Sequence, residues 1–96
     1  MTIFDIKLTK TSNAADVVSD LVSICYAGEQ ADNIAYLTGD EISDIHPRQN
    51  VQALPTRTAK ILSAICRRGM TFHVATRGRS CGIFIAKHPK HFHGKA

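Results

Sequence analysis

The sequence predicts a single domain of the α+β class. Segments in which apolar residues recur every three or four positions, typical of helices, alternate with short runs of β-branched and aromatic residues, typical of strands. A chain of 96 residues has room for one hydrophobic core, and its hydrophobic fraction of 44% is sufficient to form it. We therefore expect one globular domain and no extended disorder.

Three elements are predicted in the first part of the chain. Residues 3–8 are mostly apolar, with an acid and a lysine between, and indicate a short strand or extended arm. Ser12 or Asn13 can cap a helix over 14–27, where apolar residues recur until a glycine ends the pattern. Residues 33–38 are too few for a helix and predict one strand.

A second, short helix is predicted over 39–46. Thr38 and Glu41 have the spacing of a capping box at its start, and Pro47 ends it. A loop over 47–54 leads to the next helix.

The third helix is predicted over 56–68, because proline is tolerated at a helix start, Thr56 can act as a cap, and Gly69 follows the last turn. Its residues divide into two faces. The face expected to be buried consists of Thr58, Ala59, Leu62, Ile65 and Cys66. The opposite, largely cationic face consists of Arg57, Lys60, Ser63, Ala64, Arg67 and Arg68.

A β-hairpin is predicted over 70–87. Residues 70–75 alternate in polarity, and a β-branched and aromatic run follows the turn. Gly78 can adopt a positive φ in that turn, which leaves Arg77 and Arg79 at the tip of the hairpin.

Charge is divided unequally along the chain. Residues 1–46 contain all eight acids and two lysines, whereas residues 47–96 contain ten lysines and arginines and no acid. Four of the five histidines also lie in the second half. This asymmetry indicates an anionic partner for the basic half. The simpler alternative is that the acidic half folds against the basic half.

The order of elements resembles that of the winged helix-turn-helix superfamily. Residues 36–42 look like the strand that leads into helix two, residues 56–69 like a recognition helix, and residues 70–86 like the wing. The resemblance implies an α+β winged helix-turn-helix fold with three helices, a C-terminal β-hairpin wing and a short extra strand. The loop over 47–54 departs from the tight turn that this superfamily usually has between helices two and three.

On this interpretation the chain has three parts. Residues 1–12 form an N-terminal strand or arm, residues 13–87 the winged-helix domain, and residues 88–96 a basic His-rich tail. The tail is expected to add phosphate contacts.

The resemblance implies a small double-stranded DNA-binding protein, a transcriptional regulator, with the third helix in the major groove and the wing against the backbone or minor groove. Arg57 and Lys60 lie near the helix start, from which side chains reach base edges, and arginine can bond guanine O6 and N7 together. The candidate nucleic-acid-binding residues are Arg48, Thr56, Arg57, Thr58, Lys60, Arg67, Arg68, Arg77, Arg79 and Lys87.

Nothing in the sequence indicates an enzyme or a cofactor, because no catalytic triad order, phosphate-binding glycine loop or carboxylate pair is recognisable. His88, His91 and His93 have a spacing that metals can use, but no acid or cysteine accompanies them, so no metal site is expected. The three cysteines form no CxxC pair and are interpreted as reduced, buried thiols: Cys25, Cys66 and Cys81.

A second hypothesis belongs to a different class of function. The chain is interpreted alternatively as a small inhibitor or adaptor, for example of a mobile element, that binds a protein or nucleoprotein complex through its basic face. The first strand and the acidic side of the first helix, with Asp16 and Asp20, are candidate surfaces for a homodimer or a partner. No apolar run is long enough for a membrane span, so a cytoplasmic protein is expected.

Overall fold

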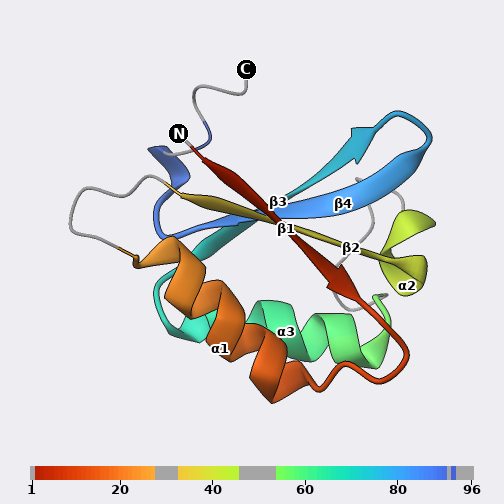
Figure 1. The fold of residues 1–96 in the computed structure, drawn as a ribbon, viewed down its shortest axis with the longest axis horizontal. Helices are drawn as coiled ribbons and strands as arrows, with labels where there is room; N and C mark the ends of the chain where they lie inside the picture. Colours follow the sequence, from red (N-terminus) through yellow and green to blue (C-terminus); the bar gives the residue numbers. More distant parts are fainter. Residues whose placement is uncertain (1, 28–32, 46–53, 91, 93–96) are drawn as a thin grey trace.

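The computed structural model describes residues 2–27, 33–45, 54–90 and 92. Its elements, in chain order, are β1 (Ile3–Leu8), α1 (Ala14–Cys25), β2 (Ile34–Gly39), α2 (Asp40–Ser43), α3 (Thr56–Arg67), β3 (Thr71–Arg77) and β4 (Ser80–Ala86). The four strands form one sheet, and α1 and α3 lie together on one of its faces (Figure 1). The molecule is therefore built of two layers, with the other face of the sheet away from the helices.

The sheet is mixed, with the strand order β1-β2-β4-β3. β1 and β2 are parallel, so the chain must cross over between them, and α1 supplies this crossover. β4 is antiparallel to both β2 and β3. As a result β1, β2 and β3 all run in the same direction, and their carboxyl ends meet at one edge of the sheet.

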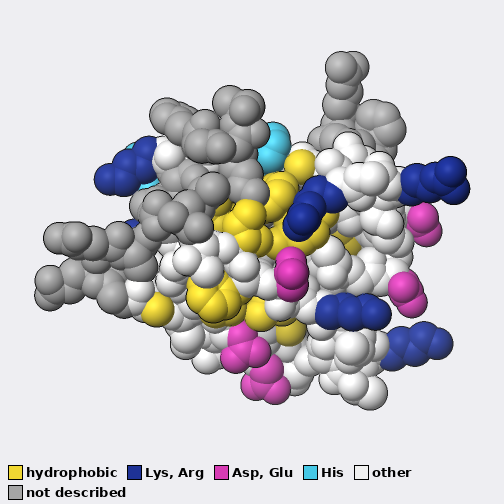
Figure 2. All heavy atoms as spheres, turned by 45° about the horizontal axis from the view of Figure 1, so that its top comes forward, with side chains coloured by type: hydrophobic (Ala, Val, Ile, Leu, Met, Phe, Trp, Pro, Cys, Tyr) yellow, Lys and Arg dark blue, Asp and Glu magenta, His cyan; other side chains and the backbone are white. Residues whose placement is uncertain are grey.

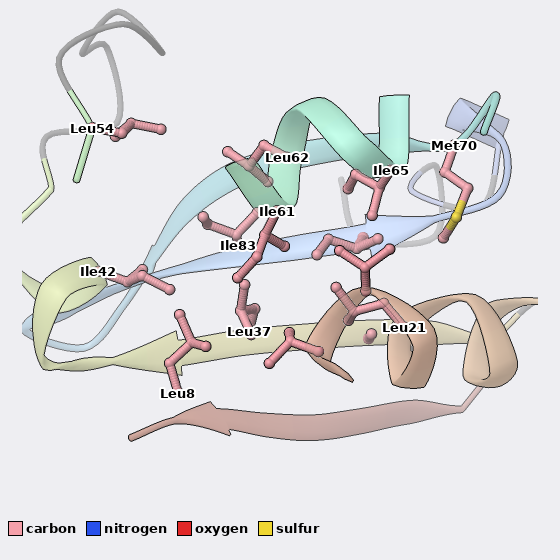
Figure 3. Close-up of a cluster of buried hydrophobic side chains, with 14 of the residues drawn as sticks. Leu8, Leu21, Leu37, Ile42, Leu54, Ile61, Leu62, Ile65, Met70 and Ile83 are labelled. Carbon is pink, nitrogen blue, oxygen red and sulfur yellow. The ribbon is translucent and has the colours of Figure 1, made fainter. Parts of the chain in front are cut away.

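The main core lies between the sheet and the two helices (Figure 3). Side chains alternate between the two faces of a strand, so every second residue of β2 and β4 points toward the helices. The fully buried side chains of this layer include Leu21 from α1, Ile61 and Ile65 from α3, Leu37 from β2 and Ile83 from β4.

A second, smaller cluster covers the opposite face of the central strands. It consists of Ile34 and Tyr36 from β2 and Phe84 and Ala86 from β4, and the partly buried Phe92 packs against it. β2 and β4 are therefore buried on both faces, and the side chains of β2 alternate between the two clusters.

The expectation of a winged helix-turn-helix fold is wrong. α2 is a single turn of four residues, Asp40–Ser43, and not the helix over 39–46 that this fold needs. Residues 3–8 are not a separate arm, because they form an edge strand paired with β2 along its whole length. α3 packs against α1 on one face of a four-stranded sheet, whereas a recognition helix packs against the helix that precedes it in a helix-turn-helix. The residues that were expected to form a wing instead supply half of the main sheet.

The positions of most single elements are nevertheless confirmed. Asn13 caps α1, because its Oδ1 accepts hydrogen bonds from the backbone N–H groups of Ala15 and Asp16. Strands occur at 3–8 and 34–39, and the hairpin turns at Gly78, which has a φ of 66°. The expected capping box at the second helix is absent, since Gly39 occupies the N-cap position and Glu41 bonds elsewhere.

Within the described ranges, no helix has the length and apolar character needed to cross a membrane.

The burial of the cysteines corrects one sequence-based face assignment. Cys25 and Cys81 are buried as expected, but Cys66 is exposed. The buried face of α3 contains Ile61, which the sequence pattern had left out, so the centre of this face is rotated away from Cys66. Burial also raises the pKa of the Cys25 thiol, which disfavours its reactive thiolate.

A thiol reagent is therefore expected to label one cysteine quickly in the native protein and all three after denaturation. The measurement is the absorbance change with a chromogenic disulfide at neutral pH, with Cys66→Ser as the control that removes the fast phase. A fast phase that survives in Cys66→Ser would contradict the burial of the other two thiols.

Gly82 is required by the aromatic cluster on the outer face of the sheet. A Cβ atom at this position would collide with the ring of Tyr36, which lies directly over the glycine. Gly82→Ala is expected to lower the free energy of unfolding by about 1–3 kcal/mol, as overpacked sites do. This loss of unfolding free energy should disappear in the Tyr36→Ala background, where the ring is absent. Urea unfolding of the wild type, the two single variants and the double variant measures this coupling, and equal costs in both backgrounds would contradict it.

Candidate nucleic-acid interface

The residues expected to bind nucleic acid do not lie on one surface. Arg48 falls in the segment 46–53, outside the described residues. The others divide among an internal network at the start of α3, the exposed side of α3, the turn of the β3–β4 hairpin and the end of β4.

Arg57 and Thr58 belong to a structural network around Glu41. The Arg57 Nε donates to Glu41 Oε1 over 3.1 Å, and its Nη1 donates to the backbone oxygen of Ser12 over 2.8 Å. The Thr58 hydroxyl, which is fully buried, donates to the same Glu41 oxygen over 2.9 Å. This network joins α2, α3 and the turn before α1. The guanidinium of Arg57 is thus half-buried and occupied, a poor position from which to read bases.

Lys60, Arg67 and Arg68 follow the solvent side of α3 and are exposed. The Arg68 Nη1 donates to the backbone oxygen of Ala64 over 3.1 Å, which satisfies a carbonyl in the last turn of the helix. These cations line one side of an open groove of about 900 Å³ between α1 and α3. Thr56, the first residue of α3, also lines this groove.

The two arginines of the β3–β4 hairpin, Arg77 and Arg79, have different surroundings from the cations of α3. The guanidinium carbon of Arg77 lies 4.8 Å from the centroid of the Tyr36 ring, an attractive cation–π geometry. Burial raises the pKa of the Tyr36 hydroxyl, and the charge of Arg77 acts in the opposite direction. Because Tyr36 belongs to the outer cluster, Arg77 lies on the face of the sheet away from the helices. Arg79 is exposed beside the turn glycine.

α3 and the hairpin tip therefore cannot contact one duplex in the manner of a recognition helix and its wing. The side chains of Lys60 and Arg67 face solvent from the helical layer, and Arg77 lies on the far side of the sheet. The sequence could not show this, because it contains no direct signal of which face of a sheet a residue occupies.

Two cations that sequence reasoning missed lie at the same end of the sheet as the hairpin tip, with β2 and β4 between β1 and β3. Lys7 is in β1, and Lys10 follows its carboxyl end. The carboxyl ends of β1, β2 and β3 share one edge of the sheet, and β3 ends at Arg77, so both lysines lie at the edge from which the hairpin turn projects. We refer to Lys7, Lys10, Arg77 and Arg79 as the hairpin edge. Recognition of the parallel β1–β2 pair was the signal that would have found them.

The same edge holds a smaller pocket of about 370 Å³. It is lined by Lys7 and Lys10 and also by Asp40, Glu41 and Arg57. Its charges are mixed, and Arg57 is already neutralised by Glu41, so the pocket itself offers little attraction for an anion.

The remaining candidate, Lys87, lies at the opposite end of β4. Its Nζ is 5.8 Å from the centroid of the Tyr26 ring, and so it sits near the end of α1 and not with the other cations. His91 and His93 of the tail lie outside the described residues. In the part of the chain that the structure describes, no three side chains of His, Cys, Asp or Glu are grouped as a metal site would require.

The unequal charge along the sequence does not produce one basic hemisphere. Figure 2 shows a face on which Lys and Arg alternate with Asp and Glu around a hydrophobic patch. Yet Arg57–Glu41 is the one ion pair found among the described residues. The two halves of the chain thus interact through packing far more than through charge pairs, and most of the described cations remain available to a partner.

Comparisons with protein-family models, with curated proteins and with solved structures find no match for this chain. Its function must therefore be argued from the surfaces themselves.

Glu41 is expected to stabilise the fold rather than to serve a ligand. Glu41→Ala leaves the buried Thr58 hydroxyl without its acceptor and removes the partner of Arg57, and should lower the free energy of unfolding by about 1–3 kcal/mol. Asp44→Ala, an exposed acid in the same region, is the matched control and should change it by less than about 0.5 kcal/mol. The measurement is urea unfolding followed by circular dichroism. Equal effects of the two substitutions would contradict the network.

Proposed function

We propose that the protein binds nucleic acid, double-stranded DNA in the first place, through contacts of the hairpin edge with the phosphate backbone. Transcription regulation is the cellular role that we propose for this binding. The observation that carries the proposal is the arrangement of Arg77, which is held over the Tyr36 ring and has no acidic partner among the described residues.

A stacked arginine is well suited to bind phosphate. Contact with the ring restricts the side chain before any ligand arrives, so less conformational entropy is lost on binding. Its N–H groups remain available as donors, and a guanidinium can bond two oxygens of one phosphate. Arg79 follows directly after the turn glycine, and Lys7 and Lys10 add positive charge at the same end of the sheet, on the far side of β2 and β4.

The hairpin tip is also free to approach a duplex. β4 pairs with β2 only over Ile83–Ile85, whereas its pairing with β3 continues to Arg77 and Ser80. The last turn of the hairpin therefore projects beyond the sheet (Figure 1). Since α3 lies flat in the helical layer, we propose contacts with the backbone and little reading of bases.

The test compares two variants that each lose two positive charges. Arg77→Ala/Arg79→Ala removes the hairpin arginines, and Lys60→Ala/Arg67→Ala removes two cations of the helical layer. Fluorescence anisotropy with a random-sequence duplex at several salt concentrations gives the affinity and its salt dependence. The hairpin variant should reduce the slope of log affinity against log salt by about two units, because each lost phosphate contact removes about one.

The helical variant should change this slope by about half as much or less. Equal losses in both variants would show that only net charge matters and would contradict the hairpin edge. Absence of wild-type binding at low salt would contradict the proposed function itself.

A further inference from the structure

The groove between α1 and α3 is distinct from the hairpin edge. Each helix has 12 residues, or about 18 Å of length, and the groove runs between these two helices. The buried side chains of Val18 and Leu54 line it at its base. We refer to it as the helix groove.

Small side chains line both walls of the helix groove. Ala15, Ser19 and Ser23 are spaced four residues apart along α1, and Ala59 and Ser63 are likewise spaced along α3. Residues four apart lie on one side of a helix, so α1 presents a row of three small residues, and α3 presents two beside its cations. Small residues at a contact let the axis of another helix come close.

The charges of the helix groove are all of one sign. Lys60, Arg67 and Arg68 line the α3 wall, and no acid is among its lining residues in the part of the chain that the structure describes. The acids of α1, Asp16 and Asp20, are not part of the lining. Lys60 and Arg67 are seven positions, or about 10.5 Å, apart along the helix, which two turns of a facing helix would match.

We propose that the helix groove is a docking site for an acidic amphipathic helix of a partner protein. The apolar stripe of such a helix packs against the small residues and the apolar base, and its acids pair with the cations of the α3 wall. This surface and its partner are independent of the proposed nucleic-acid binding at the hairpin edge.

Two other occupants fit the helix groove less well. A DNA duplex is too wide to enter between neighbouring helices, whose axes lie about 8–10 Å apart, and phosphates gain nothing from the alanine, valine and leucine side chains among the lining residues. A second copy of this chain docked groove to groove would bring Lys60 and Arg67 toward their own copies, which like charges oppose.

The test selects binders without prior bias. A displayed library of helical peptides of about 12–16 residues, enough to span the groove, is selected against the immobilised full chain. We expect the enriched peptides to carry acidic residues along one flank of an apolar stripe. Their affinity should fall by about tenfold or more in Ser63→Trp, which fills the groove, and in Lys60→Glu/Arg67→Glu, which reverses its charge.

Lys7→Glu/Lys10→Glu is the matched control, with the same charge reversal outside the groove, and should leave peptide affinity unchanged. Circular dichroism confirms that each variant is folded. The proposal is overturned if no peptide is enriched, if enriched peptides show no excess of acids, or if they bind the groove variants as tightly as the wild type.

The variant Ser63→Trp, which keeps the charge of the protein, is also titrated with the random-sequence duplex. Loss of duplex binding in Ser63→Trp, without selection of acidic helices, would identify the groove as a nucleic-acid surface and overturn the helix proposal. Unchanged duplex binding together with loss of the peptide would support it. Failure of wild-type duplex binding alone would affect only the proposed function.

Discussion

β2 and β4 lie at the centre of the sheet and carry side chains that are removed from water on both faces, and the rest of the molecule is arranged to achieve this. On one face α1 and α3 cover Leu37 and Ile83. On the other face the strands cover themselves, because the rings of Tyr36 and Phe84 lie with their centroids 4.5 Å apart and the residues after β4 return to place Phe92 beside them. The burial of apolar area from both sides is the main stabilising term for this small domain.

This two-sided burial also decides where cations can reach solvent. Those of α3 emerge from the outside of the helical layer, and Arg77 emerges over the aromatic cluster on the other face. The basic half of the sequence is thereby split into two surfaces of different character. One is an open groove between helices, lined by small and apolar residues with cations on its α3 wall, and the other is a projecting turn with little apolar surface. These differences suit a folded helix and a phosphate backbone respectively.

Local sequence patterns were enough to place most elements but not to assemble them. Periodicity located α1, α3 and the hairpin, and the two candidate caps, Ser12 and Asn13, located the start of α1. The pairing of β1 with β2 was overlooked, although a strand, a helix and a second strand in succession are typical of a parallel pair. The apolar run over 81–86 was an overlooked indication, since successive apolar residues are typical of a strand buried on both faces. The role of Glu41 was missed because its partners Arg57 and Thr58 lie 16 and 17 positions away in the sequence.

The parallel pairing of β1 and β2 has a consequence for the order in which the chain folds. Ile3 lies opposite Ile34, so 31 positions of chain must be closed into a loop before the first contact of this pair forms. In the hairpin, Arg77 lies opposite Ser80 after a turn of two residues. Loop closure costs more entropy as the loop grows, and non-local contacts therefore form late. By the same reasoning, we expect the hairpin to form first, and the pairing of β2 with β4, which closes 46 positions between Leu37 and Ile83, to form after that of β1 with β2.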